Sequence, residues 1–300
     1  MFFFTKVEHR SFIKFVSVIK VYLCRMMKPI ISVKNLVKHY DSFQAVKGIS
    51  FDVYPGEIFG LLGPNGAGKT TTLEILETLR PKTSGEVMVN DWVVGTHNNE
   101  IKKIIGVQLQ AAGYYPNLTL IELIDLFSGL YGRAVDSDQL LQKVGLTDKA
   151  KSKYPYTLPL SEVLERADLL EKRKALVRQL SGGQRQRLYF ALAIVGDPDL
   201  IFLDEPTTGL DPQARRNLWE LIRQIRDEGT TVVLTTHYMD EAEELCNRVA
   251  IIENGSIIAL DTPDKLIDNL VASGFERKKE VKKANLEDVF LNLTGQEWRE

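Results

Sequence analysis

One glycine-rich segment restricts the fold of this chain more than any other feature of its sequence. Residues 63–70 read GPNGAGKT and fit the pattern G-x-x-x-x-G-K-[ST], with the apolar run 57–62 before them. A helix is expected to begin at Lys69. In such a strand–loop–helix unit the backbone N–H groups curl around phosphate oxygens, and the helix N-terminus adds partial positive charge. The segment therefore predicts a buried strand that leads into a phosphate-binding loop.

Two side chains of this loop have expected roles beyond those of its backbone. Lys69 can reach the β and γ phosphates of a nucleotide, and Thr70 can supply a hydroxyl to Mg²⁺. An ordinary glycine-rich turn is the alternative, but it requires neither the strand before the loop nor the helix after it. The residues expected to contact the nucleotide here are Gly63, Pro64, Asn65, Gly66, Ala67, Gly68, Lys69, Thr70 and Thr71.

A pair of acids follows a second buried strand. Residues 200–203 read LIFL, and Asp204 and Glu205 come next. A carboxylate at the tip of such a strand is costly to desolvate unless a cation or hydrogen-bond donors compensate it, and Mg²⁺ beside the phosphate-binding loop would do so. Asp204 is then the acid on the metal side, and Glu205 is the candidate base that deprotonates an attacking water. The alternative, a pair of solvated loop acids, is disfavoured by the large apolar residues before them.

The segment LSGGQRQR (residues 180–187) combines a helix cap with a bare helix start. Ser181 can cap a helix, and Gln184 three residues later can complete a capping box. Gly182 and Gly183 carry no side chains, so the helix N-terminus is open to an anion. A plain helix cap and an anion-binding site are both compatible with this pattern, and neither excludes the other.

The glycine-rich loop, the LSGGQRQR segment and the acidic strand follow one another in an order that resembles the ATPases of ABC transporters, over roughly residues 30–270. The resemblance implies an α/β fold, in which a P-loop NTPase core carries an antiparallel β subdomain and an inserted α-helical subdomain. It implies ATP and Mg²⁺ as cofactors. It also implies that Ser181, Gly182, Gly183 and Gln184 meet the γ-phosphate of ATP held on another subunit, so that two sites form in an isologous pair.

Further positions resemble functional residues of that family. Tyr40 matches the aromatic that stacks on adenine, His237 the switch histidine at the γ-phosphate, and Asp211 the acid that contacts the second subunit. Gln110 matches the glutamine that contacts the metal, although the neighbouring Gln108 is a competing alignment. The simpler alternatives are that Tyr40 only packs against neighbours, that His237 only makes hydrogen bonds at the end of a strand, and that Asp211 only caps a helix before a proline. The expected catalytic residues are Glu205, His237 and Lys69, and the expected metal-site residues are Thr70, Gln110 and Asp204.

The pattern along the chain divides it into three parts. We expect an N-terminal extension over residues 1–28, an ATPase domain over 29–270 with a helical subdomain inserted at about 111–180, and a linker with a short helix over 271–300. Within the domain, Asn254-Gly255 between two apolar runs predicts a two-residue hairpin.

Two segments of this layout allow more than one interpretation. Residues 1–26 are interpreted as an overextended reading frame, because Met26 and Met27 stand just before the domain; an interfacial membrane helix is the alternative. In the helical subdomain, residues 140–151 and 163–174 match at an offset of 23 residues, either by duplication or by chance.

Composition and charge narrow the possible partners. The chain has 38 basic and 40 acidic side chains and a formal net charge of −2, so no basic field indicates a nucleic-acid partner. No uninterrupted run of about 18 apolar residues could span a bilayer, and Cys24 and Cys246 form no disulfide framework, which fits a reducing cytosol. With the family resemblance, this predicts a location at the cytoplasmic face of the cell membrane, on an integral membrane permease subunit and beside a second ATPase subunit.

Transport is the function that the resemblance implies, and export is the favoured direction. Residues 286–295, LEDVFLNLTG, resemble the ending of ATPases from multidrug and polysaccharide exporters. A soluble ABC ATPase that acts on nucleic acid or ribosomes is the alternative, but such relatives usually carry coiled-coil insertions or two cassettes, and this chain shows one cassette. A nucleotide-binding regulator without catalysis is a third hypothesis, and Lys69, Asp204, Glu205 and His237 argue against it.

Overall fold

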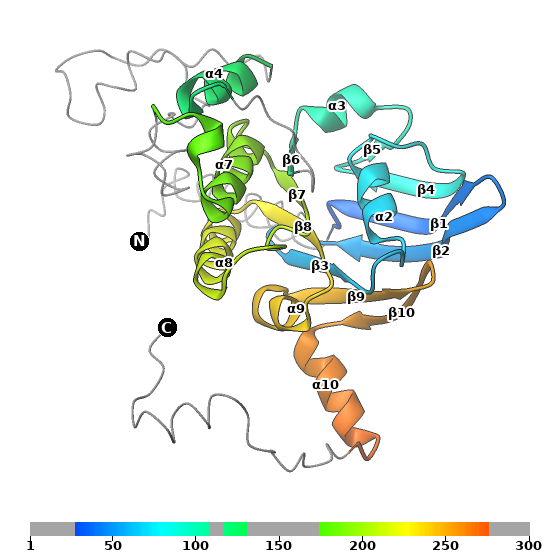
Figure 1. Ribbon diagram of the computed structural model, residues 1–300. Coiled ribbons are helices and arrows are strands. Elements are labelled where there is room, and N and C mark those ends of the chain that lie inside the picture. Colours follow the sequence, from blue (N-terminus) through cyan, green and yellow to red (C-terminus); the bar gives the residue numbers. More distant parts are fainter. Residues whose placement is uncertain (1–27, 109–116, 131–173, 276–300) are drawn as a thin grey trace, which may run out of the picture. The chain divides into compact units, whose positions relative to one another are not determined.

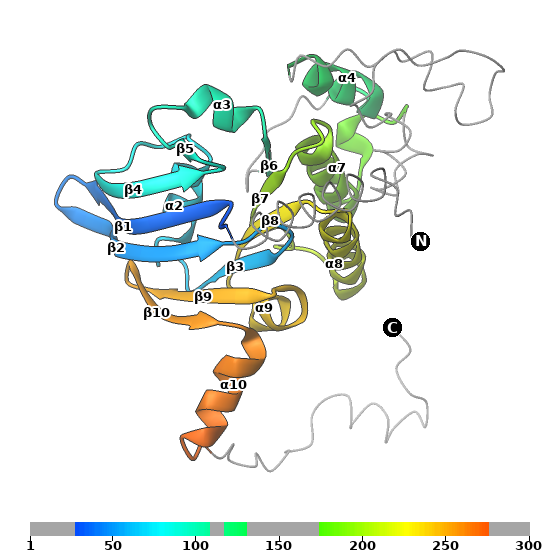
Figure 2. The same ribbon diagram turned by 180° about the vertical axis from the view of Figure 1, so that it is seen from behind.

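Two β-sheets, with helices between and beside them, make up the described part of the chain up to Asp264 (Figures 1 and 2). This computed structural model describes residues 28–108, 117–130 and 174–275. The chain builds the first two strands of one sheet, crosses to the other sheet for β3, and returns through helix α2 for β4 and β5. The phosphate-binding loop lies on that crossing, between β3 and α2.

The first sheet is antiparallel and has the strand order β2-β1-β4-β5. Side chains such as Ile31, Val33 and Leu36 are buried, whereas Lys34 is exposed, as expected for a sheet with one face on the core. The turn between the first two strands leaves Tyr40 paired with Phe43. The strands are β1 (Ile31–Tyr40), β2 (Phe43–Val53), β4 (Ser84–Val89) and β5 (Trp92–Val93).

The second sheet has the strand order β10-β9-β3-β8-β7-β6, and all neighbours run parallel except β10 with β9. Every residue of β3, β7 and β8 is buried, which explains their continuous apolar or Thr-rich sequences. Parallel strands end at the same edge of a sheet, so the residues that follow β3, β7 and β8 meet there. The strands are β3 (Ile58–Leu62), β6 (Ile105–Gln108), β7 (Leu200–Asp204), β8 (Thr231–Thr236), β9 (Arg248–Glu253) and β10 (Ser256–Asp261).

Helix α2 packs between the two sheets, because its buried Leu73, Ile75 and Leu76 share one apolar core with side chains of both. Helix α7 contacts β6, helix α8 contacts β8, and helix α9 contacts β3 and β8 (Figure 2). These helices are α2 (Lys69–Leu76), α3 (Asn98–Lys102), α4 (Leu120–Leu130), the 3₁₀ turn η2 (Val177–Gln179), α7 (Gly182–Ile194), α8 (Pro212–Asp227) and α9 (Met239–Leu245). Helix α10 (Pro263–Ala272) leads into a separate unit of the chain, and none of its residues is buried.

The predicted α/β architecture with an antiparallel β subdomain is confirmed. The predicted hairpin is also confirmed: Asn254 and Gly255 have φ of 49° and 81°, and they join β9 to antiparallel β10. None of the helices described is long and apolar enough to cross a bilayer. Five predictions fall outside the described residues: the extension before Lys28, Gln110, most of the inserted helical subdomain, the match between residues 140–151 and 163–174, and the helix expected near residues 286–293.

Candidate active site

Close backbone approaches define the phosphate-binding loop between β3 and α2. A Cβ atom at Gly63 would lie 2.2 Å from the carbonyl oxygen of Ile252, and one at Gly68 would lie 2.6 Å from that of Ala45. Gly68 also has φ of 102°, a conformation that costs L side chains energy. The loop is therefore held against β9 and β2, and no side chain caps the start of α2. Its first N–H groups can face an anion.

The side chain of Lys69 is folded into this loop. It is only 4% exposed, and Nζ donates to the carbonyl oxygens of Gly63 at 2.8 Å and Pro64 at 3.1 Å. Nζ also lies 3.7 Å from Oε1 of Glu205. Burial lowers the pKa of Lys69, and the carboxylates of Glu205 and Asp204 oppose that shift. The ammonium is thus pre-positioned beside the place where phosphate oxygens would lie.

Thr70 and Asp204 are brought together as the sequence predicts. Thr70 Oγ1 donates to Asp204 Oδ1 at 3.2 Å, and Thr235 Oγ1 donates to the same oxygen. Burial raises the pKa of Asp204, and these two hydrogen bonds oppose the shift. A hydroxyl and a carboxylate are hard oxygen ligands of the kind that Mg²⁺ prefers when substrate phosphates and waters complete its shell. The residues present fit that ion, although no group of three or more His, Cys, Asp or Glu side chains in the described ranges could hold a metal without the nucleotide.

Glu205 occupies a backbone conformation that is rare for its residue type. Its φ is 47°, in the left-handed region. Its N–H donates to the backbone oxygen of Thr235 at 3.2 Å and to Oγ1 of Thr235 at 3.0 Å. Oε2 accepts from Thr208 Oγ1 at 3.2 Å, and Oε1 lies 3.3 Å from Nδ1 of His237, without the alignment of a hydrogen bond. Such strain clusters at functional sites. The Glu205 carboxylate lies 3.7 Å from Nζ of Lys69, beside the phosphate-binding loop.

Lys69, Thr70 and Glu205 line a cavity of about 410 Å³, whereas Asp204 and His237 are not among its lining residues. Tyr40 lines it, as predicted for the base-stacking aromatic, and so does Phe43. The Tyr40 ring also lies beneath two cations, Nζ of Lys38 at 5.1 Å and the guanidinium of Arg80 at 5.2 Å from its centroid. The full lining is Tyr40, Phe43, Ala45, Asn65, Gly66, Gly68, Lys69, Thr70, Thr71 and Glu205.

A second hollow, of about 450 Å³, lies at the start of α7. Ser181 Oγ accepts from the N–H of Gln184 at 3.2 Å, and Gln184 Oε1 accepts from the N–H of Ser181 at 3.0 Å, so the predicted capping box forms. Asp211 Oδ1 caps α8 by accepting from the N–H of Ala214 at 2.8 Å. Ser181, Gly182, Gly183, Gln184 and Asp211 line this hollow, and none of them lines the cavity at the phosphate-binding loop.

Comparison with known proteins agrees with this geometry. Residues 46–208 match the family profile described as ABC transporter. The chain belongs to the ABC transporter family. The Nod factor export ATP-binding protein I of Cupriavidus metallidurans is 35% identical over 91% of this chain and all of that protein. The linearmycin resistance ATP-binding protein LnrL of Bacillus subtilis is 38% identical over 79% of this chain and 70% of that protein.

Solved structures of the same family share the fold of this ABC ATPase. A chain described as the ATP-binding subunit of an ABC transporter is 25% identical, with a TM-score of 0.66 over 88% of this chain and 99% of that one. An ATP-binding cassette in its ADP conformation is 22% identical, with a TM-score of 0.67 over 82% and 96% of the two chains. The predicted family, the predicted fold and the assignment as an ATPase are thereby confirmed.

Phe43 and Glu77 of the ABC ATPase were not predicted from the sequence, and Gln108 was predicted only as the competing alignment for Gln110. Phe43 is 63% exposed on the cavity rim, where the only sequence signal is an aromatic residue three positions after Tyr40. Gln108 ends β6 wholly buried, and its amide has no hydrogen-bond partner among the residues described. Gln110 lies outside the described residues, so both alignments of the metal-contacting glutamine stay predictions. Glu77, at the end of α2, is 2% exposed.

Glu77 generates a pH-dependent prediction. Burial, and then the charge of Asp204, raises the pKa of Glu77 from 4.5 to about 8. The folded chain therefore holds this proton more tightly than the unfolded chain, and its stability falls as pH rises through that window. Glu77→Gln removes the titrating group. The free energy of unfolding of the variant, relative to that of wild type, should therefore be about 1–3 kcal/mol higher at pH 9 than at pH 6. Urea unfolding at both pH values measures this gain.

The control for this prediction is Glu86→Gln, because Glu86 is exposed on β4. Its stability difference from wild type should be the same at both pH values. A Glu77→Gln difference that is equally flat would contradict the assignment of a raised pKa to Glu77.

Proposed function

We propose that this chain hydrolyses Mg-ATP in a site shared by two ATPase subunits and thereby drives export through a separate integral membrane permease. The observation that carries the proposal is that the residues expected to bind and hydrolyse ATP are divided between two cavities of the chain. The phosphate-binding loop and Glu205 line one cavity, while Ser181 and Asp211 line another. One chain thus holds two complementary halves, and an isologous pair would bring each half against its complement.

Within one cavity the residues have distinct proposed tasks. The loop N–H groups and Lys69 bind the phosphate chain, and Tyr40 stacks on the base. Thr70 and Asp204 would hold Mg²⁺, which would neutralise charge on the phosphates, and Gln110 is proposed as the further contact to it. The Ser181 and Gly182 end of the partner's α7 would cover the γ-phosphate, so that hydrolysis waits for closure of the pair.

The chemical step requires one proton acceptor. Glu205 takes a proton from the water that attacks the γ-phosphorus, and the bond from that phosphorus to the β–γ bridging oxygen breaks, giving ADP and phosphate. His237 lies within 3.3 Å of Glu205, where it can orient the carboxylate and contact the γ-phosphate. Positioning and charge stabilisation dominate phosphoryl transfer, so a cavity without its facing α7 should turn over slowly.

The relatives support transport in the outward direction. Their names describe Nod factor export and linearmycin resistance, and the first covers this chain almost completely. As a member of the family, the chain works as the ATP-binding part of a transporter complex with membrane subunits. We propose that it sits at the cytoplasmic face of the cell membrane through its permease and pairs with a second ATPase subunit, with no nucleic-acid partner. The net charge of −2 is consistent with this.

Substitution of the proposed base tests the chemistry. Glu205→Gln keeps the size of the side chain but cannot accept the proton, so turnover should fall by about 10²–10⁴ while ATP binding persists. The variant should also elute as an ATP-dependent dimer in size-exclusion chromatography. Glu220→Gln, on the exposed face of α8, is the control and should hydrolyse at the wild-type rate. Brisk turnover by Glu205→Gln would remove Glu205 from the role of base.

Capture of the native complex tests the transport proposal. The tagged chain, expressed in its source cells, is purified from gently solubilised membranes, and the co-purifying proteins are identified by mass spectrometry. We expect a multi-spanning membrane protein in stoichiometric amount. Recovery with ribosomes or DNA instead would favour the soluble ATPase and contradict the proposal.

A further inference from the structure

Helices α8 and α9 start at two different loops of the proposed site. Helix α8 begins directly after Asp211, whose carboxylate caps the helix. Asp211 and Ser181 both line the hollow at the start of α7. Helix α9 begins directly behind His237, with Tyr238 at its N-cap. A contact between the first turns of α8 and α9 therefore lies within one helical turn of Asp211 and of His237.

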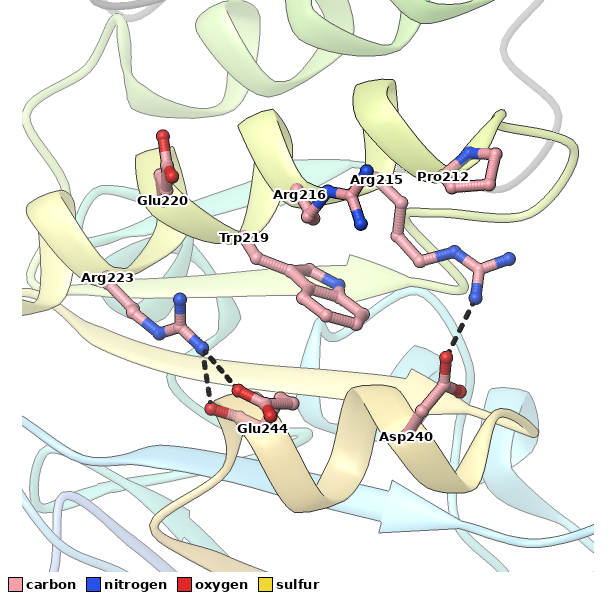
Figure 3. Close-up of a pocket in the computed structure, with 8 residues that line it drawn as sticks. All are labelled: Pro212, Arg215, Arg216, Trp219, Glu220, Arg223, Asp240 and Glu244. Atoms are coloured by element: carbon pink, nitrogen blue, oxygen red, sulfur yellow. Dashed lines mark hydrogen bonds and ion pairs between the residues drawn. The ribbon is translucent and has the colours of Figure 1, made fainter. Parts of the chain in front are cut away.

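Three contacts join the two helices at intervals of four residues along α8, and Figure 3 shows the two that involve arginine. Arg215 pairs with Asp240 at 3.0 Å, and Trp219 Nε1 donates to Oε1 of the wholly buried Glu241 at 3.0 Å. Arg223 donates to the backbone oxygen of Glu244 at 2.8 Å and lies 3.4 Å from its carboxylate. Figure 3 shows the Trp219 ring between the two arginine pairs.

Arg215 makes one contact that Arg223 does not. Its guanidinium carbon lies 4.6 Å from the centroid of the Tyr238 ring, a cation–π distance. The Tyr238 ring in turn lies 4.1 Å from the His237 ring, at an interplanar angle of 38°. Nδ1 of His237 is 3.3 Å from Oε1 of Glu205. A continuous series of side-chain contacts therefore runs from α8 to the proposed base.

We propose that Arg215 is a positioning residue for His237 and acts through Tyr238. The inference rests on the proposed function, in which His237 and Glu205 meet the γ-phosphate. The His237 side chain is 30% exposed, and among the described residues its Nδ1 has no aligned hydrogen-bond partner although it lies 3.3 Å from Oε1 of Glu205. The contact with the Tyr238 ring therefore contributes to the orientation of the imidazole. The N–H of Arg215 also donates to the carbonyl oxygen of Asp211 at 3.0 Å. Arg215 thus lies in the first turn of α8 behind the Asp211 cap, and its side chain contacts Tyr238, which packs on the switch histidine.

A purely structural role is the competing explanation, and the chain offers a matched control for it. Arg223 joins the same two helices by the same kind of pair, but it lies two turns, or about 12 Å, farther along α8. If Arg215 only clamps the helices, then Arg215→Met and Arg223→Met should behave alike. Both pairs are partly exposed, so each variant should fold and melt close to wild type.

The experiment measures melting temperature, ATP affinity, KM and kcat for Arg215→Met, Arg223→Met, Tyr238→Phe, Tyr238→Leu and His237→Ala in the full chain. We expect Arg215→Met to lower kcat about tenfold with ATP affinity and KM within twofold, because a small misplacement of a reacting group slows the chemical step. Tyr238→Leu should match it, and Tyr238→Phe, which keeps the ring, should stay near wild type. Arg215→Met combined with Tyr238→Leu should be no slower than either alone.

Four outcomes overturn the inference in distinguishable ways. Equal kcat values for Arg215→Met and Arg223→Met would leave Arg215 with a structural role only. Additive losses in the double variant would show that Arg215 does not act through Tyr238. Wild-type turnover by His237→Ala would remove His237 from the proposed site, and the inference with it, whereas slow turnover by His237→Ala beside normal Arg215→Met would remove the inference alone.

Discussion

The shared edge of three parallel strands is the constraint on which the rest of this structure depends. Strand β3 pairs with β8 so that Leu62 lies beside Thr236, and β7 pairs with β8 so that Asp204 lies beside Thr235. The loops that follow must therefore leave the sheet side by side. Gly63 to Lys69, Glu205 and His237 become neighbours because of strand register, although more than a hundred residues separate the first loop from the second.

That edge gathers charges that would be unstable if each were buried alone. Lys69, Asp204 and Glu205 are each under 10% exposed. Removing one partner from a buried charge group leaves the others uncompensated, which is generally costly. Here the ammonium is held by loop carbonyls, Asp204 by two threonine hydroxyls, and Glu205 by Thr208. Charges and donors held in place in this way are the condition under which an enzyme accelerates phosphoryl transfer.

Local patterns in the sequence were sufficient for much of the site. The phosphate-binding loop, the Ser181 capping box and the Asp211 cap are each encoded within a few residues, and the structure forms all three. The strained φ of Glu205 and the burial of Glu77 follow from neighbours far away in the sequence, so no local pattern could indicate them. The same is true of the Arg215–Tyr238–His237 contacts, because they need α8 and α9 to pack. The role of Gln110, which the family resemblance alone indicated, remains a prediction.

A working site takes the phosphate-binding loop of one chain and the start of α7 of another, according to the proposed function. Mixing two inactive variants tests it directly: Lys69→Ala disables the first half, and Ser181→Arg disables the second. In a statistical mixture, half of the dimers would carry one intact site, so activity should return to about a quarter of the wild-type value. A mixture as inactive as its two components, with dimers shown to exchange subunits, would contradict the claim.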